Sequence, residues 1–90
     1  MHFVYVLKLV NRNLYVGSTN DLKRRLQEHQ LGESTFTKKY LPAKLIYCEV
    51  YLAKGDALER EKKLKQHKSA LGHLRNRIRR SFDQDNKSGG

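Results

Sequence analysis

The chain has 90 residues, which is enough for one small domain with a single modest core. It carries 19 Lys and Arg residues against 9 Asp and Glu residues, and this net charge of +10 is typical of nucleic-acid binders. Cys48 is the single cysteine, which excludes an intramolecular disulfide and a cysteine-based zinc site. No apolar run approaches the roughly 20 residues that cross a bilayer. With no signal peptide before the first strand, we expect a cytoplasmic protein without membrane contact.

The N-terminal region predicts a β-hairpin. Residues 2–10 are rich in β-branched and aromatic side chains, which favour a strand, and an Asn-Arg-Asn turn follows. Residues 14–18 form a second predicted strand, so the two pair as a hairpin. Gly17 lies near the end of this strand, where a glycine indicates a bulge or a close backbone approach.

The first predicted helix follows the hairpin. Asn20 and Asp21 are good N-cap residues for a helix that ends near Gln30, and Gly32 follows in the usual C-terminal position. These signals bound the helix at both ends, so its faces can be assigned.

Two polar side chains fall on the apolar face of this helix. At about 100° per residue, Leu22 and Leu26 define the face, and Arg25 and His29 lie on it. Taken singly, each residue has a structural alternative. Arg25 would extend its charged group to solvent at the edge of the buried face, and His29 would be a hydrogen-bonded core histidine. Two inward polar residues one turn apart favour a functional site instead.

The middle of the chain predicts a loop and a third strand. Residues 32–43 are polar and basic, and we expect this loop to contact phosphates through Lys38 and Lys39. Residues 44–52 alternate in hydrophobicity, which predicts a third strand with at least one fully buried face. Cys48 lies in this pattern and is predicted to be a buried core thiol.

The remaining residues complete the fold prediction. Helical spacing predicts helices over residues 57–68 and 71–82, and the polar segment 83–90 is predicted to be a disordered tail. The order β-β-α-β-α-α indicates an α+β fold, a small three-stranded antiparallel sheet flanked by helices, in one domain over residues 1–82.

The second helix carries an acid on its apolar face. With Ala57 at zero, Leu64 lies at about −20° and Glu61 at about +40°. An inward carboxylate is paired, protonated or bound to a metal, and a buried ion pair with Arg25 is the structural alternative. One carboxylate with open water positions is also a typical Mg²⁺ arrangement when a substrate phosphate supplies further ligands.

The hairpin contributes two tyrosines, Tyr5 and Tyr15. Tyr5 shares a strand face with Phe3 and Leu7, so an aromatic core role is the alternative to a chemical one. A phenol has a pKa of about 10, which suits a base poorly at neutral pH, but nearby cations or a metal would lower it.

Together these residues resemble the GIY-YIG nuclease family, over about residues 3–80. The likeness is to the small, single-domain bacterial members of its excision-nuclease-like (URI-type) branch. In the first triplet, Phe3-Val4-Tyr5, only the tyrosine is kept, and residues 57–65 resemble the helix that carries the family's metal-binding glutamate. The motif residues that carry the rest of the resemblance are Tyr15, Val16, Gly17, Ser18, Thr19, Leu22, Arg25, Leu26 and His29.

The resemblance implies an endonuclease that hydrolyses phosphodiester bonds in DNA, with roles assigned by position. Tyr5 is expected to act as general base or to orient the attacking water, and Tyr15 to position the water or the scissile phosphate. Arg25 would stabilise charge developing on the phosphate, and His29 would assist the base or bind the phosphate.

The same resemblance implies one divalent metal, Mg²⁺ or Mn²⁺, held by Glu61. Gly17 would permit close packing by the active-site tyrosines. The family often has a late asparagine in the active site, and Asn76 is the candidate here.

A basic surface is expected to bind the substrate. Binding through phosphates gives weak sequence preference, so the expected enzyme is structure-directed or weakly sequence-specific. Roles in DNA repair, in recombination and in mobile elements are all compatible with this expectation. RNA as the substrate and the oligomeric state stay open. A noncatalytic nucleic-acid-binding module on the same fold is the alternative function, and a basic structural protein is the third. The predicted phosphate-binding residues of the C-terminal helices are Lys62, Lys65, Lys68, Arg75 and Arg79.

Overall fold

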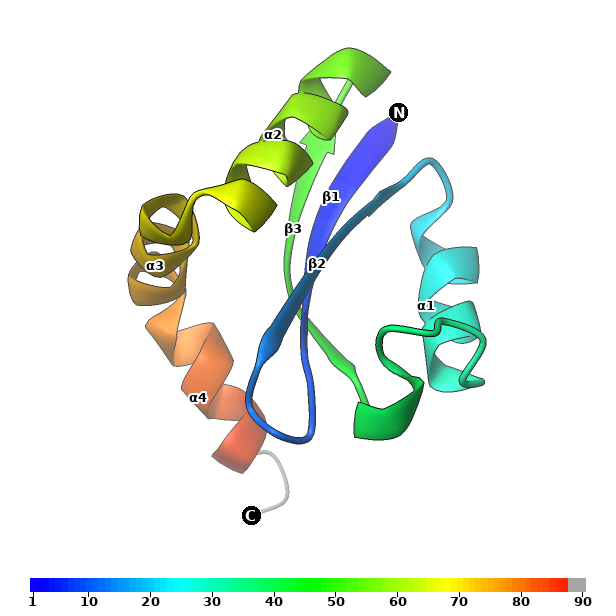
Figure 1. The fold of residues 1–90 in the computed structure, drawn as a ribbon, viewed down its shortest axis with the longest axis vertical. Helices are drawn as coiled ribbons and strands as arrows, with labels where there is room; N and C mark the ends of the chain where they lie inside the picture. The colour runs from blue at the N-terminus through cyan, green and yellow to red at the C-terminus, as the bar shows by residue number, and fades with distance from the viewer. Residues whose placement is uncertain (88–90) are drawn as a thin grey trace.

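A three-stranded antiparallel sheet forms the centre of the molecule (Figure 1). The computed structural model describes residues 1–87. β1 (His2–Lys8) is the central strand, with β2 (Leu14–Thr19) on one side and β3 (Lys44–Tyr51) on the other. The predicted hairpin and α+β class are confirmed.

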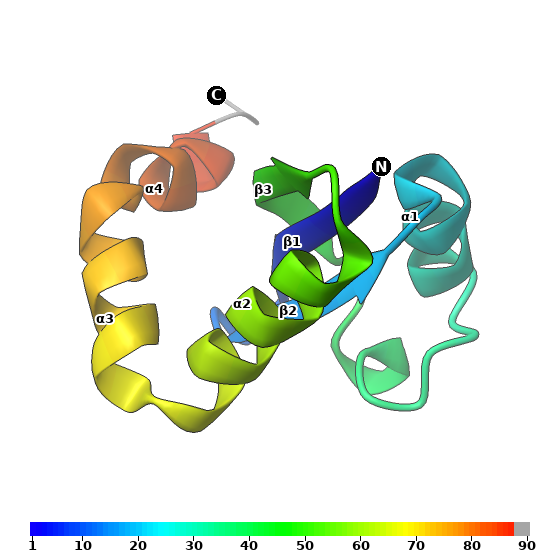
Figure 2. The ribbon, with the colours of Figure 1, turned by 90° about the horizontal axis from the view of Figure 1, so that it is seen from above.

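Helices cover both faces of this sheet. α1 lies against one face, and three consecutive helices lie on the opposite face (Figures 1 and 2). The helices are α1 (Leu22–Gln30), a short 3-10 helix η1 (Lys38–Tyr40), α2 (Lys54–Gln66), α3 (Lys68–Arg77) and α4 (Arg79–Lys87).

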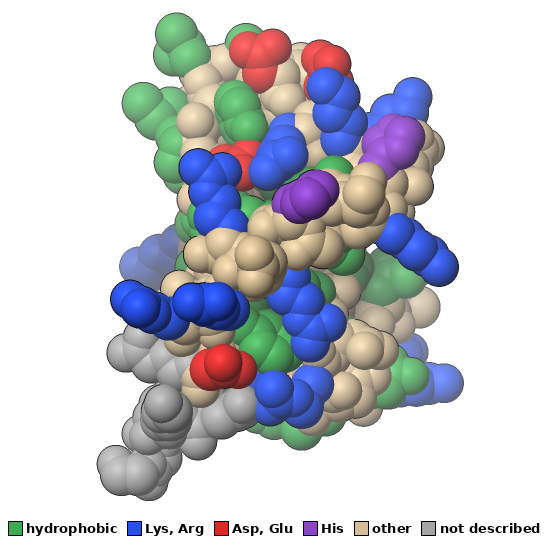
Figure 3. All heavy atoms as spheres, turned by 90° about the vertical axis from the view of Figure 1, so that its left-hand side faces the viewer, with side chains coloured by type: hydrophobic (Ala, Val, Ile, Leu, Met, Phe, Trp, Pro, Cys, Tyr) green, Lys and Arg blue, Asp and Glu red, His purple; other side chains and the backbone are tan. Residues whose placement is uncertain are grey.

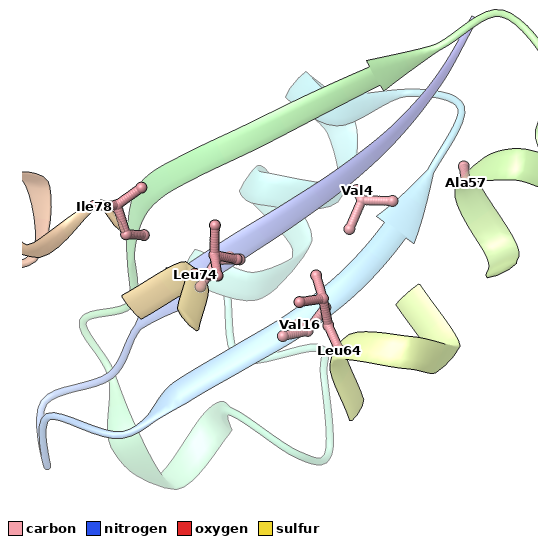
Figure 4. Close-up of a cluster of buried hydrophobic side chains, with 7 residues drawn as sticks. Val4, Val16, Ala57, Leu64, Leu74 and Ile78 are labelled. Carbon is pink, nitrogen blue, oxygen red and sulfur yellow. The ribbon is translucent and has the colours of Figure 1, made fainter. Parts of the chain in front are cut away.

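Successive side chains of β1 point to opposite faces of the sheet, and this divides the core into two clusters. Val4 and Val6 point to the face of α2 and α3, where they pack with residues of those helices (Figure 4). Tyr5 and Leu7 point to the opposite face, where α1 covers them. All four side chains are buried, because both faces of a central strand are covered.

β3 corrects two predictions. It is an edge strand, and no residue in it is buried; Val50 is 54% exposed. The pairing with β1 shifts register at Ile46, so a bulge interrupts the alternation that the sequence pattern indicated. The prediction of a fully buried strand face is therefore wrong, and Cys48 is half-buried rather than a core thiol.

An ionic cluster joins β3 to α2. Arg60 donates to both carboxylate oxygens of Glu49, at 3.0 and 3.1 Å, and the hydroxyls of Tyr47 and Tyr51 donate to the same carboxylate. Burial alone would raise the pKa of Glu49, but these hydrogen bonds hold that pKa below its usual value. Burial and the hydrogen bond to Glu49 raise the pKa of Tyr51 to about 12. This acid is fully engaged within the fold.

The predicted ends of α1 are confirmed. The Asp21 carboxylate accepts from the backbone N–H of Arg24 at 3.1 Å, and Gly32 follows the helix with φ of +77°. α2 begins at Lys54, three residues before the predicted start at residue 57.

The C-terminal helices differ from the prediction. The predicted single helix over residues 71–82 is two helices, which meet at Ile78. α4 continues to Lys87, so residues 83–87 of the predicted disordered tail are helical, and the rest of that tail lies outside the described residues. Within residues 1–87, no helix is both long and apolar enough to cross a membrane.

Candidate active site

Tyr5 packs directly on the backbone of Gly17. The two residues are cross-strand partners in the β1–β2 register, so the phenol of Tyr5 lies over a position without a side chain. A Cβ at residue 17 would lie 2.4 Å from the Tyr5 hydroxyl oxygen, well inside van der Waals contact. Gly17 therefore allows Tyr5 to pack closely on the backbone of β2.

A buried hydrogen-bond chain starts at this phenol. The Tyr5 hydroxyl lies 2.9 Å from Nε2 of His29, and Nδ1 of His29 lies 2.8 Å from the hydroxyl of Thr37. The exposed fractions of Tyr5, His29 and Thr37 are 1%, 0% and 0%. The chain joins β1, α1 and the loop before η1, so it fixes all three elements relative to one another.

Tyr15 lies beside this chain. Its ring centroid is 6.5 Å from that of Tyr5 and 5.3 Å from the His29 ring. Because β2 is an edge strand, a side chain from α2 reaches it, and Nζ of Lys65 lies 5.6 Å from the ring centroid. Phe36 stacks on Tyr15 at 6.3 Å with an interplanar angle of 28°.

Arg25 lies one helical turn before His29, as predicted. It is half-buried and pairs with Glu28 at 3.1 Å. Burial raises the pKa of Tyr5 above 10.0, and the neighbouring Arg25 opposes that rise without reversing it. Tyr5 is therefore a neutral phenol at physiological pH.

The same surroundings keep His29 neutral. Burial lowers its pKa below 6.5, and the positive charge of Arg25 lowers it further. A neutral imidazole has one donor and one acceptor nitrogen, so His29 can accept a hydrogen bond from one hydroxyl while it donates a hydrogen bond to the other.

Glu61 reaches the site from α2. Its carboxylate accepts from the Ser18 hydroxyl at 2.7 Å and pairs with Lys65 at 2.8 Å, with 18% of the side chain exposed. Burial alone would raise its pKa, but the hydrogen bonds from Lys65 and Ser18 outweigh burial, so the pKa lies below 4.5. The predicted alternative, an ion pair with Arg25, is not what the structure contains.

The donor set around Glu61 fits one hard divalent cation. An ionised carboxylate with a neighbouring hydroxyl supplies oxygen ligands, and Mg²⁺ retains waters for its remaining positions. Lys65 occupies one carboxylate oxygen at 2.8 Å, and its side chain is 46% exposed. Among residues 1–87, no group of three or more His, Cys, Asp or Glu side chains forms a denser site.

Five of the predicted site residues therefore lie near one another. Tyr5, Tyr15, Arg25 and His29 meet on the α1 face, and the charge of Glu61 is near enough to act on the Tyr5 phenol. Asn76 is different, because it is exposed on α3, on the opposite face of the sheet from α1 (Figure 1).

The site also contains residues that the sequence analysis did not assign to it. Ser18 holds Glu61 and Thr37 holds His29 through hydrogen bonds. Phe36 stacks on Tyr15 and so extends the aromatic cluster, the group of rings formed by Tyr5, Tyr15 and His29. The spacing of Glu61 and Lys65, four residues apart on a helix, is a readable signal of a salt bridge. The contacts of Ser18, Thr37 and Phe36 join segments that lie apart in the sequence, so no local sequence pattern indicates them.

The predicted phosphate-binding residues are exposed, and Lys and Arg side chains spread over the face that carries the C-terminal helices (Figure 3). A groove there is lined by Arg12, Arg75 and Arg79 together with Asn76, Phe82 and Asp83, and the Asp83 carboxylate lies 3.9 Å from the Arg12 guanidinium. The guanidinium groups of Arg12 and Arg75 lie 4.9 and 4.4 Å from the Phe82 ring, which holds both cations beside each other.

Comparison with known proteins gives one family. Residues 1–76 match the family described as the GIY-YIG catalytic domain. UPF0213 proteins of Staphylococcus aureus strains Mu3 and N315 are 37% identical over 67 residues, which cover 73% of this chain and 82% of theirs. The solution structure of a UPF0213 protein from Bacillus halodurans has a TM-score of 0.51 and 28% identity, covering 81% of this chain and 83% of that chain.

Gly17→Ala tests the packing under Tyr5. The new Cβ has no room beside a buried ring, so we expect a loss of about 1–3 kcal/mol in the free energy of unfolding. Gly72→Ala is the matched control, because nothing lies within 4 Å of its added Cβ in α3, and it should gain about 0.5–1 kcal/mol. Urea unfolding measures both, and equal stability of the two variants would refute the close packing.

The buried neutral His29 predicts a pH dependence of stability. Its pKa is lowered in the folded state, so the unfolded chain takes up a proton first as the pH falls below 6.5. The free energy of unfolding should therefore fall from about pH 6.5, above the range in which Glu49 and Glu61 lose their contributions, which begins below 4.5. Urea unfolding at stepped pH measures this, and His29→Gln should flatten the upper range. If the free energy of unfolding of His29→Gln fell with pH as steeply as that of the wild type, the effect would not come from His29.

Proposed function

We propose that this chain, which belongs to the GIY-YIG family, is an endonuclease that hydrolyses phosphodiester bonds in DNA with one divalent metal ion, Mg²⁺ or Mn²⁺. The observation that carries the proposal is a buried chain of Tyr5, His29 and Thr37 beside an ionised, half-buried Glu61. Inward, clustered titratable groups of this kind mark functional sites.

Proton transfer uses Tyr5 and His29 in sequence. Tyr5 is neutral, so it takes the proton of the attacking water only as it passes its own proton to Nε2 of His29. This requires the His29 tautomer with its proton on Nδ1, which donates to the hydroxyl of Thr37 at 2.8 Å. The water oxygen then bonds to phosphorus, the bond from phosphorus to the leaving oxygen breaks, and solvent supplies a proton to that oxygen. The proton held by Nε2 of His29 passes back to Tyr5, and the proton that Tyr5 took from the water is released to solvent, which restores both neutral groups.

Cationic and phenolic groups orient the phosphate. Arg25 keeps its charge and lies beside Tyr5, where it stabilises negative charge as the attack proceeds. Tyr15 lies between the Tyr5 ring and the ammonium group of Lys65, so the Tyr15 hydroxyl can position the water or the scissile phosphate.

Glu61 would hold the divalent ion, with Ser18 orienting the carboxylate through its 2.7 Å hydrogen bond. When bound, the ion supplies Lewis-acid polarisation of the phosphate and stabilises the leaving oxygen. Lys65 balances the charge of Glu61 through its 2.8 Å ion pair. A bound ion would take over that charge balance, and the Lys65 ammonium would then be available to a substrate phosphate.

The exposed cations supply the affinity for the substrate. Lys38 and Lys39 lie on η1 beside the aromatic cluster, and Arg75 and Arg79 lie in the groove on the opposite face. Contacts of this kind read the phosphate backbone rather than base edges, which favours recognition of DNA structure over sequence, as in repair or recombination.

A noncatalytic nucleic-acid-binding module is the second candidate. One observation favours it, because both carboxylate oxygens of Glu61 already have protein partners, Ser18 and Lys65. A satisfied acid of this kind can be structural, as Glu49 is. The same experiment separates the two functions.

Glu61→Gln should reduce cleavage to the level seen in EDTA while binding remains. The amide keeps the size of the side chain and can accept from Ser18, but it loses the charge that a divalent ion requires. The measurement is cleavage of end-labelled duplex, branched and single-stranded DNA in Mg²⁺, Mn²⁺ or EDTA.

The matched control is Glu59→Gln, which removes an acid from the same helix. Glu59 is 66% exposed and pairs with Lys63, so cleavage should stay at the wild-type level. Cleavage by wild-type protein in EDTA would contradict a metal-dependent reaction. Tight binding without cleavage in any metal would favour the binding module.

Salt dependence tests the groove of Arg75 and Arg79. Each phosphate contact that is lost should reduce the slope of log binding constant against log salt by about 1, so replacing both with Gln should reduce it by about 2. Lys54→Gln serves as the control, because Lys54 is exposed and is the first residue of α2, and it does not line this groove. Figure 1 shows the start of α2 at the opposite end of the molecule from α4. An unchanged slope in the double variant would remove the groove from the binding surface.

A further inference from the structure

Phe36 is the exposed member of the aromatic cluster. Its side chain is 74% exposed, although it stacks at 6.3 Å on Tyr15, a residue of the proposed site. We propose that Phe36 is a stacking platform for an unpaired nucleobase next to the scissile phosphate. This inference rests on the proposed function and deepens it by naming the substrate class.

The ring of Phe36 is held in place on one side. Tyr15 lies nearly parallel to it, at 28°, and Tyr15 is itself held by the edge of His29 at 5.3 Å. The platform is therefore continuous with the chemical group, and a base stacked on it belongs to a nucleotide near the reacting phosphate.

The loop that carries Phe36 is anchored at the next residue. Thr37 is fully buried and contacts His29 at 2.8 Å, while Ser34 is 4% exposed. The backbone N–H groups of Thr37 and Lys38 both donate to the carbonyl of Ser34, at 3.3 and 3.0 Å. An exposed ring on an anchored loop is pre-organised, so a ligand does not have to order the loop when it binds.

The surroundings of the ring fit a nucleobase better than an apolar protein partner. The residues on either side of it in sequence are Thr35 and Thr37, and Lys38 and Lys39 follow, so the immediate sequence neighbours of the ring are polar or basic. The other exposed apolar side chains of this connection, Leu31 and Tyr40, are five and four residues away in the sequence. Protein-binding surfaces need a contiguous apolar patch, whereas one aromatic ring among cations is the usual arrangement for stacking a base of single-stranded nucleic acid.

The platform selects unpaired bases for a geometric reason. Within a duplex, both faces of a base are already covered by its neighbours, so a base must leave the stack before it can contact Phe36. That step has the smallest cost where a base is already unpaired, as at a fork, a flap or a single-stranded end. The substrate class is therefore DNA with an unpaired base beside the cleaved bond.

Binding in EDTA tests the platform without cleavage. The probes are a blunt duplex and a forked duplex of the same sequence, with 2-aminopurine placed in turn at the unpaired positions next to the fork. Stacking on Phe36 should quench the fluorescence. Phe36→Leu keeps an apolar side chain but removes the ring, and it should weaken binding to the fork by about 5- to 100-fold while duplex binding changes little.

Two further variants complete the design. Phe36→Trp should retain fork binding and quenching, because indole also stacks on bases. Leu52→Ala removes another exposed apolar side chain, which is 89% exposed and directly follows β3, and this variant should behave as wild type. Unfolding of Phe36→Leu is measured alongside, since a residue this exposed should change stability by less than about 0.5 kcal/mol.

Failure of this inference differs from failure of the proposed function. If the wild type neither binds nor cleaves DNA, the proposed function fails and the platform fails with it. If the wild type cleaves but Phe36→Leu binds and quenches forked DNA as the wild type does, only the platform is overturned. Equal weakening on blunt and forked DNA would also overturn it, because the effect would then not require an unpaired base.

Discussion

The contact of Tyr5 with the backbone of Gly17 is the constraint on which the site depends. It fixes the β1–β2 register, because a slip of one residue would turn Tyr5 to the opposite face of the sheet. The phenol held there provides the hydrogen bond that docks α1 through His29, and His29 in turn anchors the loop through Thr37. One cross-strand pair thus positions a helix and a loop that are distant from it in the sequence.

Two half-buried acids show how the fold separates a structural charge from one available to a ligand. Glu49 accepts three hydrogen bonds from Arg60, two of them from the same Nε–H, and two from tyrosine hydroxyls, so both of its oxygens are engaged within the fold. Glu61 has one hydroxyl and one ammonium group as partners, and the Lys65 side chain that carries the ammonium is 46% exposed. Both acids have lowered pKa values, but only Glu61 can exchange a partner for a cation without breaking a contact between strand and helix.

Local sequence patterns predicted the structure correctly where short-range geometry, such as helix capping and helical spacing, determines it. The capped helix of nine residues put Arg25 and His29 on one face, and the structure places both beside Tyr5. The sequence could not predict strand order, so the alternating third strand was expected to be buried although it lies at the edge with a bulge at Ile46. The break at Ile78 also went unpredicted, because apolar spacing continues through it from one helix to the next. The stacking of Phe36 depends on a loop path, which residue spacing does not encode.

Paramagnetic broadening by Mn²⁺ would test most directly whether Glu61 meets a divalent ion beside the tyrosines. In ¹H–¹⁵N spectra of the wild type, substoichiometric Mn²⁺ should first attenuate the amide signals of Ser18 and Glu61, and excess Mg²⁺ should restore them. The attenuation should disappear in Glu61→Gln and persist in Glu59→Gln. Broadening that remains in Glu61→Gln, or that centres on other acids, would contradict a metal site at Glu61 and leave its contacts with Ser18 and Lys65 as structure alone.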